Sequence, residues 1–283
     1  MAPGTRGDYT ARAVEAARRI LVELFGIMGE FREYIAVIGG WVPALIHGDT
    51  ATQPPGSLDV DLAVDFNHIS DETYRTLLET MVAAGYRQDK EQPFRFFKTV
   101  ALADGPPVEV EVDFLAGEYG GTGKGRRTQR VQDVRARKAR GADLVFDHCI
   151  EMRIEGRLPS GALDAVTIKV ANVVAFLAMK GMALCDRRKD KDPYDIFYCV
   201  ANYPGGVHPL AEAFRPFTAN RLVAEGLGKI RGKFLSPEHV GPAAVANVLE
   251  IRDSEERDIV MRDAYERVAA FLGLLGVSPW EQD

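Results

Sequence analysis

Residues 58–64 read Leu-Asp-Val-Asp-Leu-Ala-Val, and the architecture of the chain can be inferred from this stretch outward. Apolar residues alternate with Asp59 and Asp61, which predicts a strand that buries one face and turns both carboxylates to the other. The same alternation recurs over residues 108–115, where Asp113 is the last of three acids. The two stretches therefore predict two strands, each with an apolar face and an acidic face.

A glycine pair precedes the first of these strands. Residues 34–38 are a short apolar run that predicts a buried strand, and Gly39 and Gly40 follow it directly. Residues 41–47 then predict a helix that begins beside the glycines. Backbone N–H groups at such a strand–glycine–helix turn can hold phosphate groups, although a tight turn without a ligand would also account for the pair.

The acids create an electrostatic problem. Asp59 and Asp61 lie about 6.5 Å apart as alternate residues of a strand, and Asp113 would add a third negative charge. Their mutual repulsion would approach about 8 kcal/mol at an effective dielectric of about 20, so a cation is needed to neutralise them. Mg²⁺ prefers carboxylate oxygens together with substrate phosphates, and paired Mg²⁺ ions serve in-line displacement at phosphorus. The cluster therefore predicts a magnesium site, with a solvated acidic strand face as the alternative.

The composition is that of an ordinary globular protein. The chain has 283 residues, of which 46% are apolar and 27% charged, and this excludes a disordered or disulfide-stapled class. The change from mixed to helical patterns predicts an α/β domain over residues 1–165 and a helical domain over 166–283. Three cysteines lack metal-ligand spacing, and the five histidines, His47 among them, are predicted at the surface or in helix caps. No apolar run reaches the roughly 20 residues of a membrane span, so we expect a cytoplasmic protein with no membrane partner.

Helical periodicity outlines much of the remaining chain. Apolar residues recur at three- and four-residue steps over residues 14–28, 71–84 and 255–275, which predicts amphipathic helices. Ser70 or Asp71 is expected to cap the second of them, because both side chains can accept a hydrogen bond from the first helical turn.

One segment is strongly basic. Residues 124–140 hold eight Lys or Arg side chains and a single acid, Asp133, in a chain whose formal charge is −6. Such a local charge of +7 can attract RNA, since neutralised phosphates release their counterions. The alternative is a solvated helix whose basic side chains pair with acids elsewhere in the fold.

These features together resemble the nucleotidyltransferase superfold of the polymerase-beta type, in which a strand–Gly-Gly–helix turn is followed by an Asp-x-Asp strand and a later acidic strand. The stretch from Lys180 to Asp195, KGMALCDRRKDKDPYD, is similar to the K-x₂-A-L-x₂-R-x₃-K-D-x₂-D pattern of the AbiEii-like nucleotidyltransferases, which include abortive-infection and MenT-type toxins. The resemblance covers residues 34–203. It implies an α+β fold with a mixed β-sheet, flanking helices and a C-terminal helical domain.

The resemblance also implies roles for individual residues. Metal binding would fall to three acids, Asp59, Asp61 and Asp113, the last beside the attacking hydroxyl. Nucleotide phosphates would be contacted by Gly39, Gly40, Lys180, Arg187 and Lys191, with Lys180 as the leading candidate for a catalytic contact. Lys169 could take that role instead, or Lys180 could simply be solvated. Asp192 and Asp195 have a structural explanation as helix N-cap and capping-box acid, because Pro193 marks an expected helix start.

The implied activity is Mg²⁺-dependent transfer of a nucleoside monophosphate from an NTP to an acceptor hydroxyl, with release of pyrophosphate. The acceptor could be the 3′ end of tRNA, as in MenT-type toxins, and an antitoxin partner would then be expected; it could instead be a small molecule, as in antibiotic nucleotidyltransferases. The basic segment favours RNA. Gly40 stands where the family often has Ser, and Gly48–Ser57 lengthen the loop before Asp59. These departures leave a non-catalytic nucleotide- or RNA-binding module as a further alternative.

Overall fold

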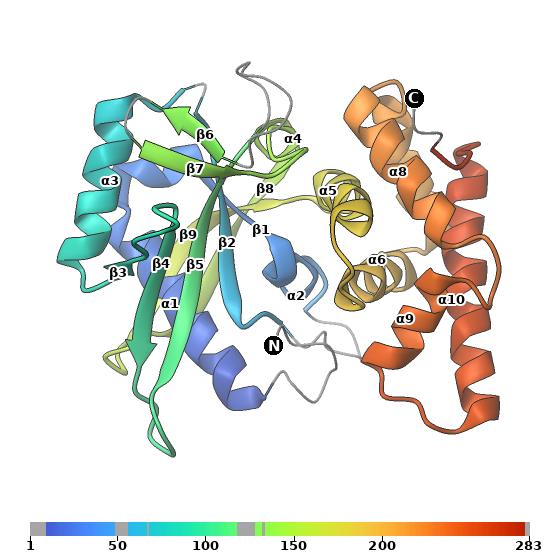
Figure 1. Cartoon of the computed structure of the whole chain (residues 1–283), viewed down its shortest axis with the longest axis horizontal. Helices are drawn as coiled ribbons and strands as arrows, with labels where there is room; N and C mark the ends of the chain where they lie inside the picture. Colours follow the sequence, from blue (N-terminus) through green and yellow to red (C-terminus); the bar gives the residue numbers. More distant parts are fainter. Residues whose placement is uncertain (1–9, 49–55, 67, 118–127, 132–133, 281–283) are drawn as a thin grey trace. The chain divides into compact units, whose positions relative to one another are not determined.

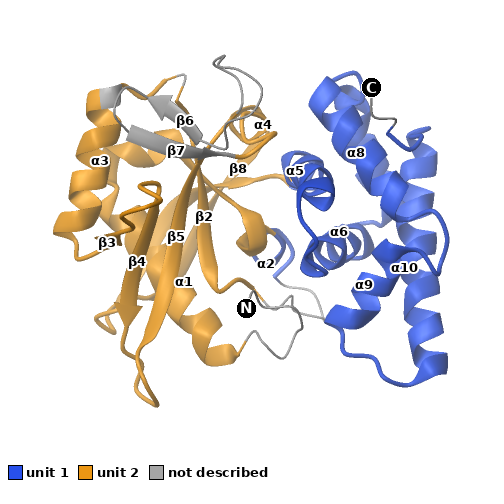
Figure 2. Cartoon of the chain, in the orientation of Figure 1, with its two compact units in different colours: residues 1–9, 43–55, 173–283 blue, residues 10–42, 56–172 orange. Residues whose placement is uncertain are grey.

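A computed structural model describes residues 10–48, 56–66, 68–117, 128–131 and 134–280. The chain divides into two compact units (Figure 2), and each is considered by itself. The sheet unit contains Thr10–Val42 and Gly56–Asn172, and the helical unit contains Val173–Asp283 with two earlier segments, Met1–Tyr9 and Pro43–Pro55. The division after Asn172 lies beyond the predicted boundary at residue 165, because the last strand of the sheet continues to Ala171.

The sheet unit is built on a mixed sheet (Figure 1), as predicted. The strands follow the order β3-β4-β5-β2-β1-β9-β8, with β7 beside β5 and β6 beside β7. Their bounds are β1 Ile35–Ile38, β2 Asp59–Val64, β3 Arg87–Gln88, β4 Arg95–Val100, β5 Val108–Ala116, β6 Thr128–Val131, β7 Val134–Lys138, β8 Cys149–Arg157 and β9 Leu163–Ala171. The strands β2 and β5 run parallel as direct neighbours, so the two acidic stretches lie side by side.

Helix α1, Ala11–Ile27, covers the apolar face of this sheet. Thr10 caps its first turn by accepting a hydrogen bond from the Ala13 backbone N–H at 3.2 Å. The face beneath it is formed by side chains that are fully buried, among them Val60, Leu62, Val110, Val112 and Phe114. An ion pair of 2.7 Å between Glu23 of α1 and Lys98 of β4 ties the helix to the same face. Since side chains alternate along a strand, the acids of β2 and β5 point to the opposite face.

Further elements complete the sheet unit. Gly39–Trp41 form a 3₁₀ turn, and α4 spans Leu144–Asp147. Helix α2, Val42–Ile46, belongs from Pro43 onward to the helical unit. Helix α3, Asp71–Ala83, is capped by Ser70, whose hydroxyl accepts from the Thr73 N–H at 3.1 Å, which confirms the first of the two predicted caps. Strand β4 was not predicted, because its residues Arg95–Val100 do not alternate between apolar and polar.

The described part of the basic segment forms strands. Strands β6 and β7 pair antiparallel through Thr128–Val131 and Val134–Lys138, so the alternative of a solvated helix is wrong. A short strand pair is favoured here because β7 also extends the sheet alongside β5. Residues 124–127 and 132–133 lie outside the described residues, and RNA binding by this segment stays a prediction.

The helical unit packs six helices after residue 172. They are α5 Val173–Asp186, α6 Lys191–Ala201, α7 Val207–Phe214, α8 Arg221–Lys233, α9 Val240–Val248 and α10 Ser254–Leu274. Helices α5 and α8 approach closely at two glycines: a Cβ on Gly181 would lie 2.0 Å from the carbonyl oxygen of Gly226. Phe214 and Phe271 meet edge to face at 5.1 Å between ring centroids. The predicted C-terminal helix is confirmed, with Val268 and Leu272 on its buried side.

Two expectations for the helical unit are wrong. Asp192 and Asp195 do not cap α6, because the helix already begins at Lys191 and both carboxylates are buried against cationic side chains. His47 is neither at the surface nor in a cap: it is buried, and its ring lies 6.4 Å from the ring of Tyr198. Burial lowers the pKa of His47 below its usual value, because a protonated imidazole loses its hydration there.

Candidate active site

The three predicted acids come together on one face of the sheet. In the parallel pairing of β2 with β5, Asp61 lies opposite Asp113 and Asp59 lies opposite Glu111. Residues in direct register on neighbouring strands, about 4.8 Å apart, project to the same side of a sheet. Asp59 and Asp61 are half-buried, whereas Asp113 is 3% exposed. The sheet therefore places an acidic row across two strands, as the sequence predicts.

The predicted glycine turn lies against this row. Ile38, the last residue of β1, pairs with Asp61, and Gly39 follows with a φ of 71°. A Cβ at Gly39 would lie 2.1 Å from Oδ2 of Asp61 and 2.9 Å from its Cβ. Only glycine tolerates both the positive φ and this approach, because any other side chain would overlap the carboxylate. The turn and the Asp-x-Asp strand thus form one local structure.

Arg95 is a member of this cluster that the sequence did not reveal. It lies opposite Asp113 in the antiparallel pairing of β4 with β5. Its Nε and Nη2 donate to the two oxygens of Asp113, each at 2.8 Å, and Nη2 also lies 2.8 Å from Glu111 Oε1. The hydrogen bonds to Asp113 raise the pKa of Arg95 above its usual value. A two-pronged contact of this kind is a strong charge-assisted interaction.

Arg95 changes the electrostatic expectation for the site. Repulsion among Asp59, Asp61 and Asp113 was expected to require bound cations, but Arg95 neutralises Asp113 from within the protein. Arg95 thus supplies part of the positive charge that was expected from a cation, and metal binding by Asp113 stays a prediction. Asp59 accepts a hydrogen bond from the hydroxyl of buried Ser57, which orients one of its oxygens. The case for a cation rests on Asp59 and Asp61.

The donor chemistry at Asp59 and Asp61 fits Mg²⁺. Both supply carboxylate oxygens, the ligands that this ion prefers, and phosphate oxygens of a substrate would complete its coordination. Within the described residues, no group of three or more His, Cys, Asp or Glu side chains is arranged so that it could hold a metal ion. The metal-binding roles of Asp59, Asp61 and Asp113 stay predictions.

The predicted cationic residues of the helical unit form a separate buried cluster. Lys180 of α5 donates to Asp192 Oδ1 and Asp195 Oδ2, each at 2.7 Å. Lys191 lies 2.9 and 3.1 Å from the two oxygens of Asp195. Arg187 donates hydrogen bonds to the two oxygens of Asp192, from Nε at 2.8 Å and from Nη2 at 3.0 Å. Lys180 is therefore not a solvated side chain, and its ammonium is engaged by two carboxylates.

The pKa shifts in this cluster follow from burial and from the ion pairs. Burial alone would lower the pKa of Lys180, but Asp192 and Asp195 outweigh it and raise the pKa. For Asp192, burial would raise the pKa, and the charges of Lys180 and Arg187 lower it instead. Burial dominates for Lys191, whose pKa is lowered despite Asp195. Lys180 and Asp192 are thus held in their charged forms.

The predicted phosphate contacts differ in accessibility. The Arg187 side chain is 47% exposed, whereas those of Lys180 and Lys191 are 8% and 4% exposed. Lys169, the alternative to Lys180, donates to the backbone carbonyl of Glu33 at 2.8 Å. Contacts of all four residues with a phosphate stay predictions, and Arg187 and Lys169 are more accessible to solvent than Lys180 and Lys191.

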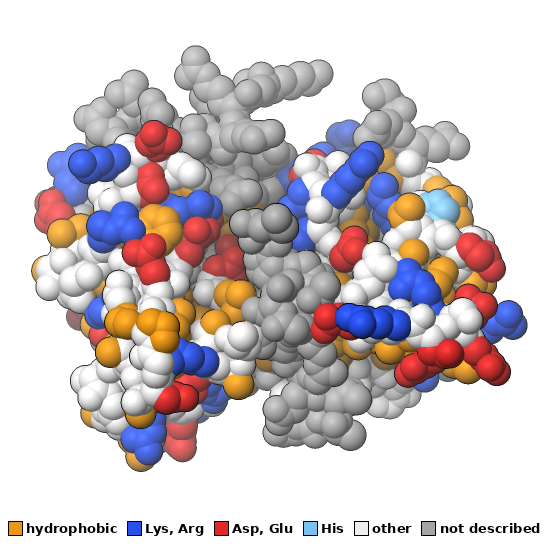
Figure 3. All heavy atoms as spheres, turned by 60° about the horizontal axis from the view of Figure 1, so that its bottom comes forward, with side chains coloured by type: hydrophobic (Ala, Val, Ile, Leu, Met, Phe, Trp, Pro, Cys, Tyr) orange, Lys and Arg blue, Asp and Glu red, His pale blue; other side chains and the backbone are white. Residues whose placement is uncertain are grey.

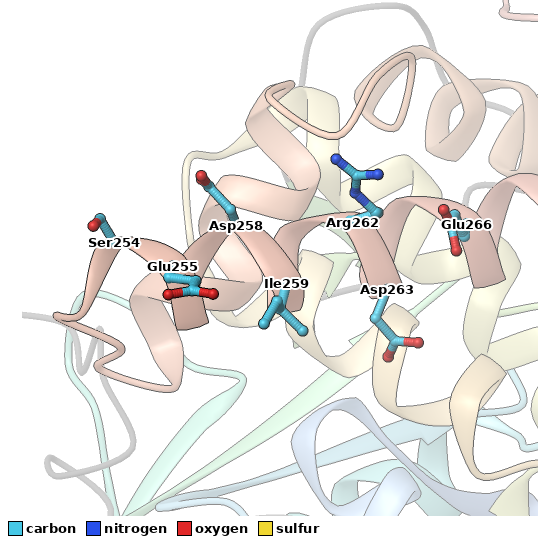
Figure 4. Close-up of a pocket in the computed structure, with 7 residues that line it drawn as sticks. All are labelled: Ser254, Glu255, Asp258, Ile259, Arg262, Asp263 and Glu266. Atoms are coloured by element: carbon cyan, nitrogen blue, oxygen red, sulfur yellow. The ribbon is translucent and has the colours of Figure 1, made fainter.

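Two surface hollows lie away from the predicted residues. One, of about 630 Å³, follows the outer side of α10 from Ser254 to Glu266 and is lined by side chains of that helix alone (Figure 4). The other, of about 600 Å³, lies between α3 and the segment from Gln88 to Pro93. Acidic and basic side chains are intermixed on the face shown in Figure 3. Among the described residues, no helix has the length and apolar character of a membrane span.

A mixed sheet with an Asp-x-Asp strand packed against a glycine turn agrees with the nucleotidyltransferase fold expected from the sequence. The chain belongs to the AbiEii family, because the model described as "Nucleotidyl transferase AbiEii toxin, Type IV TA system" matches residues 56–276. A solved structure from H. pylori described as a "putative nucleotidyltransferase" is 13% identical, covering 94% of this chain and 98% of that chain, with a TM-score of 0.43. A comparison with curated proteins finds no match. The family assignment favours an enzyme over a non-catalytic module.

Proposed function

We propose that the protein transfers a nucleoside monophosphate from an NTP to an acceptor hydroxyl in the presence of Mg²⁺ and releases pyrophosphate. The contact between Gly39 and Asp61 carries this proposal. It supports a single site in which the turn holds the triphosphate while the carboxylates of Asp59 and Asp61 hold the cation. Membership of a nucleotidyltransferase toxin family supports the reaction class.

The reaction needs few groups from the protein. The acceptor hydroxyl loses its proton to solvent as its oxygen forms a bond to the α-phosphorus, while the bond to the β-phosphate oxygen breaks and pyrophosphate leaves with that oxygen. Backbone N–H groups at Gly39 and Gly40 would orient the triphosphate for in-line attack. Mg²⁺ would lower the repulsion between phosphate oxygens and the attacking oxygen. Asp113 would face the acceptor hydroxyl, which requires it to share or release one of its contacts with Arg95.

RNA is the proposed acceptor class, with the 3′ end of tRNA as the specific candidate. The basic segment 124–140 supports an RNA acceptor through its charge, and a toxin role implies a cognate antitoxin. A small hydroxylated molecule is the alternative acceptor. Because acceptor choice leaves the phosphoryl chemistry unchanged, the two are distinguished only by where the transferred label appears.

Labelled NTPs, Mg²⁺ and total tRNA or small hydroxylated acceptors test the proposal directly. Asp59→Ala and Asp61→Ala are expected to lower transfer on the order of 10²–10³-fold, since each removes a proposed ligand of a charge-stabilising cation. Glu109→Ala is the matched control, because Glu109 lies on the same strand face but pairs with exposed Arg87 at 2.9 Å. Full transfer by Asp61→Ala would refute the site, and label on small molecules alone would refute an RNA acceptor.

A further inference from the structure

Strand β8 leaves one edge of the sheet open. It is the last strand in the sheet order, and among the described residues it pairs with β9 alone. It is nine residues long, Cys149–Arg157. A long edge strand presents a row of backbone N–H and C=O groups that a further strand can bind. The question is which strand the sequence of β8 would accept.

The hydrogen bonds to β9 show which backbone groups face this edge. Asn172 donates to the carbonyl of His148 at 2.8 Å, and Leu158 donates to the carbonyl of Ala162 at 2.8 Å. In an antiparallel pair, alternate residues direct both backbone groups to the same side. The even-numbered residues of β8 therefore bond to β9, and the odd-numbered residues direct their N–H and C=O groups outward. Arg18 confirms this direction by donating to the outward carbonyl of Glu155 at 3.0 Å.

The outward residues carry an alternating charge pattern. Besides Cys149 they are Glu151, Arg153, Glu155 and Arg157, and these four charged side chains are exposed. If a second copy of β8 pairs antiparallel about a twofold axis at Ile154, Glu151 lies opposite Arg157 of the other copy and Arg153 opposite Glu155. All four cross-strand pairs then join opposite charges, and opposite charges facing one another across strands are stabilising.

The same pattern rejects the neighbouring registers. Shifting the axis by one residue in either direction places Arg153 opposite an arginine and Glu155 opposite a glutamate. Like charges directly opposite one another are destabilising. On the other side of the strand, the twofold register brings two copies of Ile154 together, and Ile150, which is 41% exposed, would lie opposite Leu158 of the second copy. Charge and apolar contact thus favour one register.

We propose that the edge strand β8 is a self-association surface, where two copies of this chain pair antiparallel through Cys149–Arg157 and join their sheets. A twofold contact of this kind uses the same patch on both copies and closes on itself. The outward carbonyl of Glu155 can serve both Arg18 and a partner N–H, because a carbonyl oxygen has two lone pairs. The proposal is independent of the reaction that the protein catalyses.

A charge-swap series tests this surface in the full chain by sedimentation over a range of protein concentrations. Arg153→Glu places like charges opposite one another at two symmetric positions, so it is expected to raise the dimer dissociation constant about tenfold or more. Glu155→Arg is expected to do the same. The double variant Arg153→Glu/Glu155→Arg restores opposite charges and is expected to recover the dimer. Glu212→Arg, at an exposed pair in the helical unit, is the control and should leave association unchanged.

Amide hydrogen exchange gives a second measurement that does not depend on substitutions. As protein concentration rises, exchange at residues 151, 153, 155 and 157 is expected to slow, while their even-numbered neighbours, already bonded to β9, change little. A chain that stays monomeric at all concentrations would overturn the proposal. So would a dimer that survives Arg153→Glu, or one that the folded double variant fails to restore.

Discussion

One cluster of charged side chains lies in the helical unit and another lies on the sheet, and the two differ in exposure. In the helical unit, the carboxylates of Asp192 and Asp195 are 1% exposed and are bound by Lys180, Lys191 and Arg187. Each acid has at least two cationic partners within 3.1 Å. Buried carboxylates need such cationic partners, since a buried charge without a partner is strongly destabilising.

The cluster on the sheet differs in exposure and in its share of acids. Asp59, Asp61, Glu111 and Asp113 share one face, and Arg95 neutralises Asp113 and Glu111. Asp59 and Asp61 are half-buried beside the glycine turn. An acidic face that is partly open to solvent can accept a cation at little structural cost, whereas a closed ion network cannot. The comparison separates buried ion pairs within the helical unit from half-buried acids that we propose to bind a cation.

Asp195→Asn should have the largest effect on folding. The substitution removes the carboxylate charge between Lys180 and Lys191, and breaking a buried ion pair by removing one partner costs about 3–5 kcal/mol. Asp61→Asn should change the free energy of unfolding by less than about 1 kcal/mol, because the charge of a side chain that is only half-buried contributes little to stability. Urea denaturation of both variants measures the difference. Equal losses in the two would contradict the division between structural and binding clusters.

Arg95→Gln tests the cluster on the sheet through its affinity for divalent cations. It removes the internal cation that neutralises Asp113 and Glu111, so the acidic face becomes more negative. Divalent cations are then expected to bind about tenfold more tightly, which corresponds to about 1.4 kcal/mol. Mn²⁺ binding followed by electron paramagnetic resonance measures this without requiring activity. Arg87→Gln, at the exposed pair with Glu109, is the control, and an unchanged affinity in Arg95→Gln would exclude a cation site beside Asp113.

The sequence predicted the elements whose patterns are local. Alternation in residues 58–64 and 108–115 located β2 and β5. The family resemblance placed the glycine turn near Asp61, and in the structure Gly39 lies against the Asp61 carboxylate. Arg95 was missed because its partner lies 18 residues away and β4 shows no alternation. Only the strand register brings the two residues together.

The helical cluster was misinterpreted for a related reason. An Asp before a Pro is the usual pattern of a helix N-cap, and this local pattern accounts for Asp192 without an ion pair. In the structure α6 begins at Lys191, two residues before Pro193, and the Asp192 side chain points to Lys180 of α5. A rule based on neighbouring residues cannot predict a contact with another helix. The same limit applies to His47, whose burial beside Tyr198 depends on residues about 150 positions away in the chain.

The smallest expected effect is the pH dependence of the contribution that Asp192 makes to the free energy of unfolding. The ion pairs lower the pKa of Asp192 below its usual value of 3.8, so near and below that pH the unfolded chain binds more protons at this residue than the folded chain does. Its contribution to stability is therefore fully present above pH 3.8 and is lost as the pH falls toward the lowered pKa. The free energy of unfolding of Asp192→Asn, measured against pH, should be lower than that of the native chain at neutral pH, and the gap should narrow on acidification. A gap that stays constant down to the lowest accessible pH would show that Asp192 stabilises α6 by packing rather than by charge.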